Sequence, residues 1–290
     1  MINDILLEYK AKIESRLDML NSLSGQPYDG VVEASRYSLM AGGKRIRPII
    51  LLEFYKLCGG DDDCAYNFAC AVEMIHTYSL IHDDLPCMDD DDFRRGMASC
   101  HKKYGESMAL LAGDNLLTEA FCVCAKTLGL PQERVLKAIA YLASAVGTSG
   151  MIGGQVIDTC AKIDNEQTLF KMYSLKTCAL IRASAVCGAI LAGADNDKIM
   201  LAEKYSENLG LAFQIIDDLL DKDGNAEIIG KPVGSDEKNQ KNTSIKLLGE
   251  ERCKALATEL TKNAISALDE FDGDVSTLKE LTQLLLTRDR

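Results

Sequence analysis

The stretch of sequence that decides the fold reads Ile81-His82-Asp83-Asp84-Leu85-Pro86-Cys87-Met88-Asp89-Asp90-Asp91-Asp92-Phe93-Arg94-Arg95-Gly96. Apolar residues at helical spacing precede it, so its first aspartates are expected at the end of a helix. Asp83 and Asp89 stand six residues apart, a spacing that a regular helix does not align. Pro86 lies between them and should disturb the helix. A break at this point could bring Asp89 back beside Asp83.

Two adjacent arginines follow these carboxylates. Arg94 and Arg95 are expected at the end of the helix, and guanidinium groups match phosphate oxygens. Carboxylate oxygens such as those of Asp83 and Asp89 are hard ligands that suit magnesium. The combination predicts a diphosphate site. A solvated charged surface is the alternative, which the closely flanking apolar residues disfavour.

A second acidic cluster reads Phe213-Gln214-Ile215-Ile216-Asp217-Asp218-Leu219-Leu220-Asp221. At about 100° per residue, its three aspartates and Gln214 share one stripe of a helix, and the isoleucines and leucines fall elsewhere. Stacked carboxylates repel one another unless a cation lies between them. The cluster therefore predicts a second magnesium site.

The rest of the chain predicts helices. Apolar residues recur at helical spacing over residues 1–23, 30–40, 48–58, 64–81, 107–127, 133–147, 166–191 and 195–220, and two amphipathic helices are expected over 250–286. Pro48 suits a first helical position, and Asp61–Asp63 are expected to form a loop and a helix cap. No alternation of strands and helices and no internal repeat is visible. The simplest interpretation is an all-α fold with a single domain over residues 1–290.

Composition excludes several classes of protein. The net charge of −12 argues against nonspecific binding of nucleic acid, which needs a basic surface. The eleven cysteines contain no C-x-x-C pair, so small core residues are expected rather than a zinc site. We find no apolar run of about 18 residues and no signal peptide pattern. The sequence therefore predicts a cytoplasmic protein without a membrane span.

Several motifs together resemble the trans-isoprenyl diphosphate synthases, most closely the bacterial farnesyl diphosphate synthases, over nearly the whole chain. The two aspartate clusters match the first and second aspartate-rich motifs of that family. Four further matches, in order along the chain, are Gly42-Gly43-Lys44-Arg45-Ile46-Arg47-Pro48, Lys176-Thr177, Phe213-Gln214 and Gly230-Lys231-Pro232. The sequence departs from the family pattern after Gly96, where Met97 and Ala98 replace the usual lysine and proline.

The resemblance implies a helical bundle with a central active-site cavity, a homodimer and three magnesium ions per active site. The residues that it assigns to magnesium are Asp83, Asp84, Asp89, Asp217 and Asp221. Those that it assigns to the allylic diphosphate are Arg94, Lys176 and Lys231. Those that it assigns to isopentenyl diphosphate are Gly43, Lys44, Arg47, His76 and Arg95. Thr177 and Gln214 are expected to offer oxygens near the cationic carbons of the substrate, and no side chain is expected to act as the base.

Product length should depend on what closes the hydrocarbon pocket below the first aspartate cluster. Tyr78 and Ser79 lie five and four residues before Asp83, and Tyr78 is about one helical turn from His82. In the family that this chain resembles, an aromatic residue at this position limits the product to C15. We therefore expect farnesyl diphosphate, made through geranyl diphosphate. The alternative is that Tyr78 packs between helices and another residue closes the pocket.

Three other functions compete with this interpretation. A geranylgeranyl diphosphate synthase of the same family would carry the same motifs. A class I terpene cyclase also uses an aspartate-rich helix, but the Gly43-Lys44-x-x-Arg47 loop and the Asp217-Asp218-x-x-Asp221 cluster favour chain elongation. A non-catalytic regulatory subunit on the same fold should have lost metal ligands, and none of the expected ligands is missing.

Overall fold

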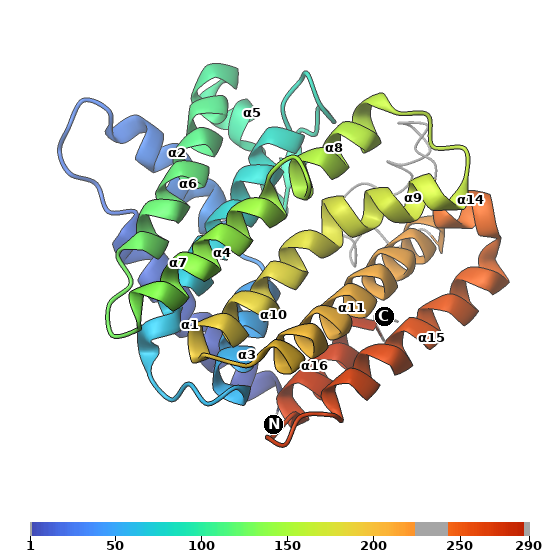
Figure 1. Cartoon of the computed structure of the whole chain (residues 1–290). Helices are drawn as coiled ribbons and strands as arrows, with labels where there is room; N and C mark the ends of the chain where they lie inside the picture. Colours follow the sequence, from blue (N-terminus) through green and yellow to red (C-terminus); the bar gives the residue numbers. More distant parts are fainter. Residues whose placement is uncertain (1, 224–242, 287–290) are drawn as a thin grey trace. The chain divides into compact units, whose positions relative to one another are not determined.

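The computed structural model describes residues 2–223 and 243–286. These residues are almost entirely helical, apart from a two-stranded antiparallel hairpin (Figure 1). The all-α prediction is therefore confirmed for the described residues. The chain divides into two compact units, residues 1–52 with 62–131 and residues 53–61 with 132–290, and each is described by itself.

The first unit is built around one buried helix. Its elements are α1 (Ile2–Leu20), α2 (Asp29–Leu39), the start of α3 (Ile46–Leu57), the 3₁₀ turn η1 (Asp63–Ala65), α4 (Tyr66–Asp83), β1 (Phe93–Arg94), β2 (Met97–Ala98), α5 (Cys100–Tyr104) and α6 (Glu106–Ala125). Helix α4 packs against α1, α2 and α6. It is apolar on every side, with Phe68, Val72 and Ile75 fully buried, as expected of a helix surrounded by others.

Helix α4 ends two residues beyond the predicted range 64–81. Its last residue is Asp83, and Asp84 caps it, donating its N–H to the carbonyl of Leu80 at 3.1 Å. Pro86 follows two residues later. Because proline disfavours helical geometry in the residue before it, the helix cannot easily continue past this point. The chain then forms the hairpin in which Phe93 pairs with Ala98 and Arg94 with Met97.

The second unit is also helical. Its elements are the end of α3, α7 (Gln132–Val146), α8 (Met151–Cys160), α9 (Glu166–Tyr173), the π turn η2 (Ser174–Cys178), α10 (Ala179–Ala192), α11 (Asn196–Asp223), α14 (Ser244–Leu248), α15 (Glu250–Leu268) and α16 (Ser276–Leu286). Helix α10, yellow in Figure 1, contacts α7 and α11, and α11 contacts α15 along its length. Val186, Ala189 and Leu191 of α10 are buried, so α10 forms the centre of this unit's core.

Several predicted boundaries differ from the structure. The helix expected over 166–191 is interrupted by η2, and α3 begins at Ile46, which makes Pro48 its third residue rather than its first. Helices α5, α8 and α14 and the hairpin were not expected from the sequence. Asp62 caps η1 by accepting a hydrogen bond from the N–H of Cys64, as predicted for the acidic run at 61–63.

Three stretches are long and apolar enough to cross a membrane, judged by length and composition alone: Glu106–Ala125, Gln132–Cys160 and Glu166–Ala192. In the third, 78% of the most apolar window is buried inside the protein. The prediction that the chain has no apolar stretch long enough to span a membrane is therefore wrong. The absence of a membrane span stays a prediction.

Candidate functional site

The first aspartate cluster lies at the end of α4, where the helix breaks. The backbone N–H of Asp89 donates a 2.9 Å hydrogen bond to the carbonyl oxygen of Asp83. The bond closes a loop over Pro86, so the two residues come together as predicted. Both are half-buried, whereas Pro86 is exposed. The break thus brings together two carboxylate residues that a continuous helix would have separated.

Asp84 has a different role from its two neighbours. Its carboxylate is ion-paired with the guanidinium of Arg94, whose Nε–Oδ1 distance is 3.0 Å, and Arg94 also contacts Asp91 at 3.1 Å. Asp84 is only 2% exposed. A buried charge is stable only when it is paired, and this pair ties the hairpin to the end of α4.

The sequence predicted that Arg94 and Arg95 lie at a helix end, but the structure places them elsewhere. Arg94 belongs to β1, and Arg95 occupies the hairpin turn with a φ of 53°. The prediction was wrong because α4 ends at Asp83, well before both residues. The hairpin sends the two side chains to different partners, Arg94 to the aspartates and Arg95 to the glycine loop.

A basic cluster surrounds His76. The Arg95 guanidinium donates a hydrogen bond to the carbonyl of Gly42, and a Cβ on Gly43 would lie 2.9 Å from Arg95 Cζ. Gly43 also has a φ of 129°, so two observations require glycine there. Burial, and then the charges of Arg47 and Arg95, hold the pKa of His76 well below its ordinary value. Of the residues predicted to bind isopentenyl diphosphate, Lys44 is the most exposed.

Arg45 belongs to the same loop but has a structural role. It is 2% exposed and donates to Glu73 at 2.6 Å, to Glu14 at 3.1 Å and to the carbonyl of Leu39 at 2.7 Å. These contacts fix the loop between α2 and α3. Its neighbours Lys44 and Arg47 are more exposed.

Tyr78 lies below the first aspartate cluster on α4. Its ring packs edge-on against His82 at a centroid distance of 5.5 Å, which confirms the predicted proximity of the two residues. His82 in turn lies 3.0 Å from the carbonyl of Leu110, and Gly113 leaves room for the imidazole. Tyr78 is 6% exposed, and the half-buried Ser79 donates its hydroxyl to the carbonyl of His76 at 2.9 Å.

In the second unit, Lys176 and Thr177 lie on the π turn η2. A π turn changes the direction of successive side chains and is frequent at functional sites. The ammonium group of Lys176 contacts the carboxylate of Asp158 on α8. Helix α8 approaches closely at this point, because a Cβ on Gly154 would lie 2.2 Å from the backbone nitrogen of Lys176.

Thr177 and Gln214, both expected to offer oxygens near the cationic carbons of the substrate, contact each other. The Thr177 hydroxyl donates to Gln214 Oε1 at 2.9 Å, and Gln214 Nε2 donates to Asp218 at 3.2 Å. Asp218 also accepts hydrogen bonds from the Tyr173 hydroxyl and from the N–H and hydroxyl of Ser244, the latter two at 2.8 and 2.7 Å. Burial raises the pKa of Asp218, although these hydrogen bonds act in the opposite direction.

The acidic cluster of α11 therefore divides into two faces. Asp218 is 5% exposed and joins α11 to α9 and α14, whereas Asp217 and Asp221 are half-buried. Asp217 and Asp221 are four residues apart and lie on one side of the helix. The predicted single stripe of three aspartates is thus only partly correct. Lys231 and its motif lie outside the described residues, so that prediction stays untested.

Sequence reasoning missed several residues of these networks. Asp158 is the one charged residue in the segment Met151–Cys160, and that contrast was a usable signal. Tyr173 stands three residues before Lys176, but nothing in the sequence connects it to Asp218, which is 45 residues away. The same holds for Ser244.

Comparisons with known proteins agree with this geometry. The family model described as polyprenyl synthetase matches residues 29–284. A dimethylallyltranstransferase of Fischerella ambigua is 44% identical over 289 residues, covering 98% of this chain and 83% of that protein. A chloroplastic geranylgeranyl pyrophosphate synthase of Capsicum annuum is 47% identical over 245 residues, covering 83% of this chain and 66% of that protein.

A solved structure shows the same fold. The crystal structure of a geranyltransferase from Helicobacter pylori, complexed with magnesium and isoprenyl diphosphate, matches with a TM-score of 0.82 at 31% identity. The match covers 98% of this chain and 95% of that one. The expected all-α fold of the isoprenoid synthases is therefore confirmed.

Proposed function

We propose that this protein makes farnesyl diphosphate. The proposal starts from its family, because the chain belongs to the polyprenyl synthetase family of trans-isoprenyl diphosphate synthases. The chain is a prenyltransferase that elongates prenyl diphosphates. The proposal adds the specific reaction, in which isopentenyl diphosphate is joined head to tail with dimethylallyl and then geranyl diphosphate. Among the structural observations, the closure of the loop between Asp83 and Asp89 carries it, because that closure makes a carboxylate pair suited to a diphosphate-bound cation.

The carboxylates fit magnesium by their chemistry. Asp83 and Asp89 in the first unit, and Asp217 and Asp221 in the second, supply hard oxygen donors from half-buried positions, and magnesium prefers such donors. When bound, magnesium supplies positive charge that stabilises the diphosphate as it leaves. We assign Asp84 to holding Arg94 rather than to binding the ion, since the Asp84 carboxylate is buried against that guanidinium.

Cationic side chains assist the departure of the allylic diphosphate. Arg94 and Lys176 are proposed to contact its oxygens, as is Lys231. In the substrate-free protein, Asp84 and Asp158 hold the charged groups of Arg94 and Lys176 in place. Charged groups fixed in advance stabilise a developing negative charge without costly reorganisation.

Isopentenyl diphosphate is assigned to the basic cluster. Arg47 and Arg95 provide positive charge for its diphosphate, and Gly43 allows the backbone to approach. The depressed pKa of His76 keeps its imidazole neutral near pH 7, so it serves as a hydrogen-bonding group rather than as a charge. Lys44, exposed at the start of the cluster, is proposed to complete the site.

The chemistry at carbon needs positioning more than acid–base catalysis. The double bond of isopentenyl diphosphate attacks the allylic carbon as its bond to diphosphate breaks, and a proton is then lost to the departing diphosphate. Thr177 and Gln214 place oxygen atoms that stabilise the positive charge on carbon, and Asp218 orients the Gln214 amide. Positioning two substrates together supplies much of the rate enhancement.

Product length is the finer part of the proposal. The buried ring of Tyr78, packed on His82, supports a floor that limits the chain to C15. The second candidate is a C20 product, favoured by the 47% identity to a protein named geranylgeranyl pyrophosphate synthase. A regulatory subunit is disfavoured, since Asp83, Asp89, Asp217 and Asp221, the four aspartates that we assign to magnesium, are all present in the sequence.

The test is a product assay. The purified protein is incubated with magnesium, isopentenyl diphosphate and each allylic primer in turn: dimethylallyl, geranyl and farnesyl diphosphate. Products are separated by chain length and measured by mass spectrometry, with a chelator control. We expect metal-dependent C15 from the two shorter primers. C20 would overturn the C15 assignment and retain chain elongation, and no product from any primer would contradict both.

Tyr78→Ala tests the pocket floor directly. Removing the buried ring should extend products beyond C15, because it leaves a cavity along the path of the growing chain. Tyr104→Ala is the matched control, since Tyr104 lies on the short helix α5 and packs against Tyr37, and its removal should leave the product length unchanged. Unchanged C15 output from Tyr78→Ala would refute the floor.

A further inference from the structure

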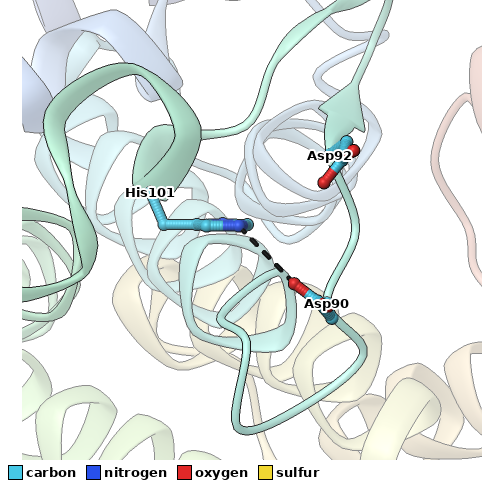
Figure 2. A group of neighbouring side chains, drawn as sticks. All are labelled: Asp90, Asp92 and His101. Carbon is cyan, nitrogen blue, oxygen red and sulfur yellow. Dashed lines mark ion pairs between the residues drawn. The ribbon is translucent and has the colours of Figure 1, made fainter.

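Three donor groups converge just beyond the first aspartate cluster. The carboxylates of Asp90 and Asp92 and the imidazole of His101 each offer a ligand atom, and these atoms all lie within 4.8 Å of one another. Figure 2 shows the imidazole directed at Asp90, with Asp92 further along the same loop. The two aspartates precede β1, and His101 lies in the first turn of α5.

The histidine is buried and one of its nitrogens lacks a hydrogen bond. His101 is 6% exposed, and Nε2 has no hydrogen-bond partner. The nearest charged oxygen, Oδ1 of Asp90, is 3.8 Å away, which is longer than a hydrogen bond. A buried polar atom left unsatisfied costs about 1–3 kcal/mol, so this arrangement calls for an additional partner.

The second ring nitrogen is already held. Nδ1 of His101 lies 3.0 Å from the hydroxyl of Ser99, which fixes the direction of the imidazole. Histidines that bind metals use such a contact on the nitrogen opposite the ion to set ring orientation. In the tautomer that binds a metal, Nδ1 carries the proton and donates it to the Ser99 hydroxyl, and the Nε2 lone pair is then available to an ion held with the two carboxylates.

The loop is held so that the donors stay together. Asp90 adopts a φ of 52°, a conformation that a residue other than glycine seldom adopts, and its N–H bonds the carbonyl of Leu85 at 3.2 Å. The carbonyl of Asp92 accepts from the N–H of Ser99 at 2.9 Å. Both aspartate side chains remain about 60% exposed, which leaves room for water ligands.

Lys102 is the group that competes for this position. Its ammonium lies 2.7 Å from Oδ1 of Asp92 and offsets part of the negative charge. It is itself 44% exposed, and exposed ion pairs contribute little to stability. Lys102 donates to the carboxylate of Asp92 but not to the His101 imidazole, so Nε2 of His101 stays without a hydrogen bond.

We propose that Asp90, Asp92 and His101 bind a divalent transition metal, with Mn²⁺ as the experimental probe, at a site separate from the magnesium carboxylates. Two carboxylates and one imidazole nitrogen favour Mn²⁺ or Zn²⁺ over Mg²⁺, because imidazole suits transition metals. The ion would connect the loop that precedes Arg94 to α5. The site is independent of the proposed prenyl transfer, which does not require it.

The test is pulsed electron paramagnetic resonance of Mn²⁺ bound to the substrate-free protein. Coupling to an imidazole nitrogen is a signature that an all-carboxylate site does not give. We expect that coupling in the wild type and in Asp83→Asn/Asp89→Asn, and its loss in His101→Gln. Asp90→Asn/Asp92→Asn should weaken binding by about tenfold or more, and it keeps the test valid if His101→Gln does not fold.

Two controls sharpen the result. Asp61→Asn removes an exposed aspartate from another acidic run and should leave the coupling and the affinity unchanged. Lys102→Ala removes the competing cation and should tighten binding by up to about fivefold. The proposal is refuted if the wild type shows no nitrogen coupling, or if His101→Gln or Asp90→Asn/Asp92→Asn binds Mn²⁺ with the same spectrum and affinity. Because no prenyl substrate is used, this outcome is separate from that of the product assay.

Discussion

The carboxylate of Asp84 faces the guanidinium of Arg94, and both side chains are shielded from water, with 3% and 16% exposed. Asp84→Asn would remove the main charged partner of Arg94 and leave its contact with Asp91. Breaking a buried ion pair by removing one member costs about 3–5 kcal/mol, and the remaining contact with Asp91 places the expected loss near the lower value. The free energy of unfolding is measured in urea.

A matched exposed pair provides the control for this prediction. Asp18 and Arg36 form the same kind of ion pair, with side-chain exposures of 45% and 48%. Asp18→Asn should cost less than about 1 kcal/mol, because solvent screens exposed pairs. Equal losses from the two variants would show that burial does not set the strength of the Asp84–Arg94 pair.

Gly113 tests the packing under the aspartate cluster. A Cβ there would lie 2.1 Å from Nε2 of His82, so Gly113→Ala must displace the imidazole that packs on Tyr78. We expect a loss of about 1–3 kcal/mol, as is usual for overpacking. Gly30→Ala on helix α2 is the control, because its Cβ would meet the Met108 side chain at an ordinary 3.6 Å. Alanine restricts the unfolded chain more than glycine does, so the free energy of unfolding should rise by about 0.4–1 kcal/mol. Destabilisation by both would point to a general effect of helix substitution.

The pH dependence of stability should depend on His76. Burial and two arginines depress the pKa of His76 in the folded protein, whereas the unfolded chain protonates it near its ordinary value of about 6.5. Below that pH the unfolded state binds more protons, so stability is full above about pH 6.5 and falls as pH decreases, by up to about 1.4 kcal/mol per unit. Urea unfolding between about pH 7 and pH 5 should show a shallower decline for His76→Asn than for the wild type. Parallel declines would be inconsistent with a depressed pKa.

Tyr173 and Asp218 test the network behind Gln214. Tyr173→Phe removes a hydrogen bond to a buried carboxylate, which is expected to cost about 1.5–3 kcal/mol. Tyr205→Phe removes a bond of 2.9 Å to the neutral hydroxyl of Thr282 and should cost about 1 kcal/mol. If Asp218 orients Gln214, Tyr173→Phe should also lower kcat more than it changes KM. A stability loss with unchanged kcat would assign Tyr173 a purely structural role.

The sequence could predict what depends on local spacing. Helical periodicity located most of the long helices, and Pro86 between two aspartates indicated the break that joins Asp83 to Asp89. The family motifs then supplied the roles. These signals are local, so they can be read without knowing which residues of other elements pack against them.

Spacing alone could not separate aspartates that face inward from those that do not. Asp84 and Asp218 look equivalent to their neighbours on a helical wheel, but their partners Arg94, Tyr173 and Ser244 come from other elements. The hairpin has strands of two residues, too short for an alternating pattern, and the π turn at Lys176 has no sequence signature. For this reason the helix end expected at Arg94 and Arg95 was wrong.

The central claim is tested most directly by supplying labelled isopentenyl diphosphate with geranyl diphosphate and magnesium, and by measuring label in the extended product. The wild type should incorporate one labelled unit and give C15, whereas Asp83→Asn/Asp89→Asn should lose most of the rate, because its metal-binding carboxylates are gone. Gly30→Ala should match the wild type. No incorporation by the wild type, or an undiminished rate in Asp83→Asn/Asp89→Asn, would contradict the account.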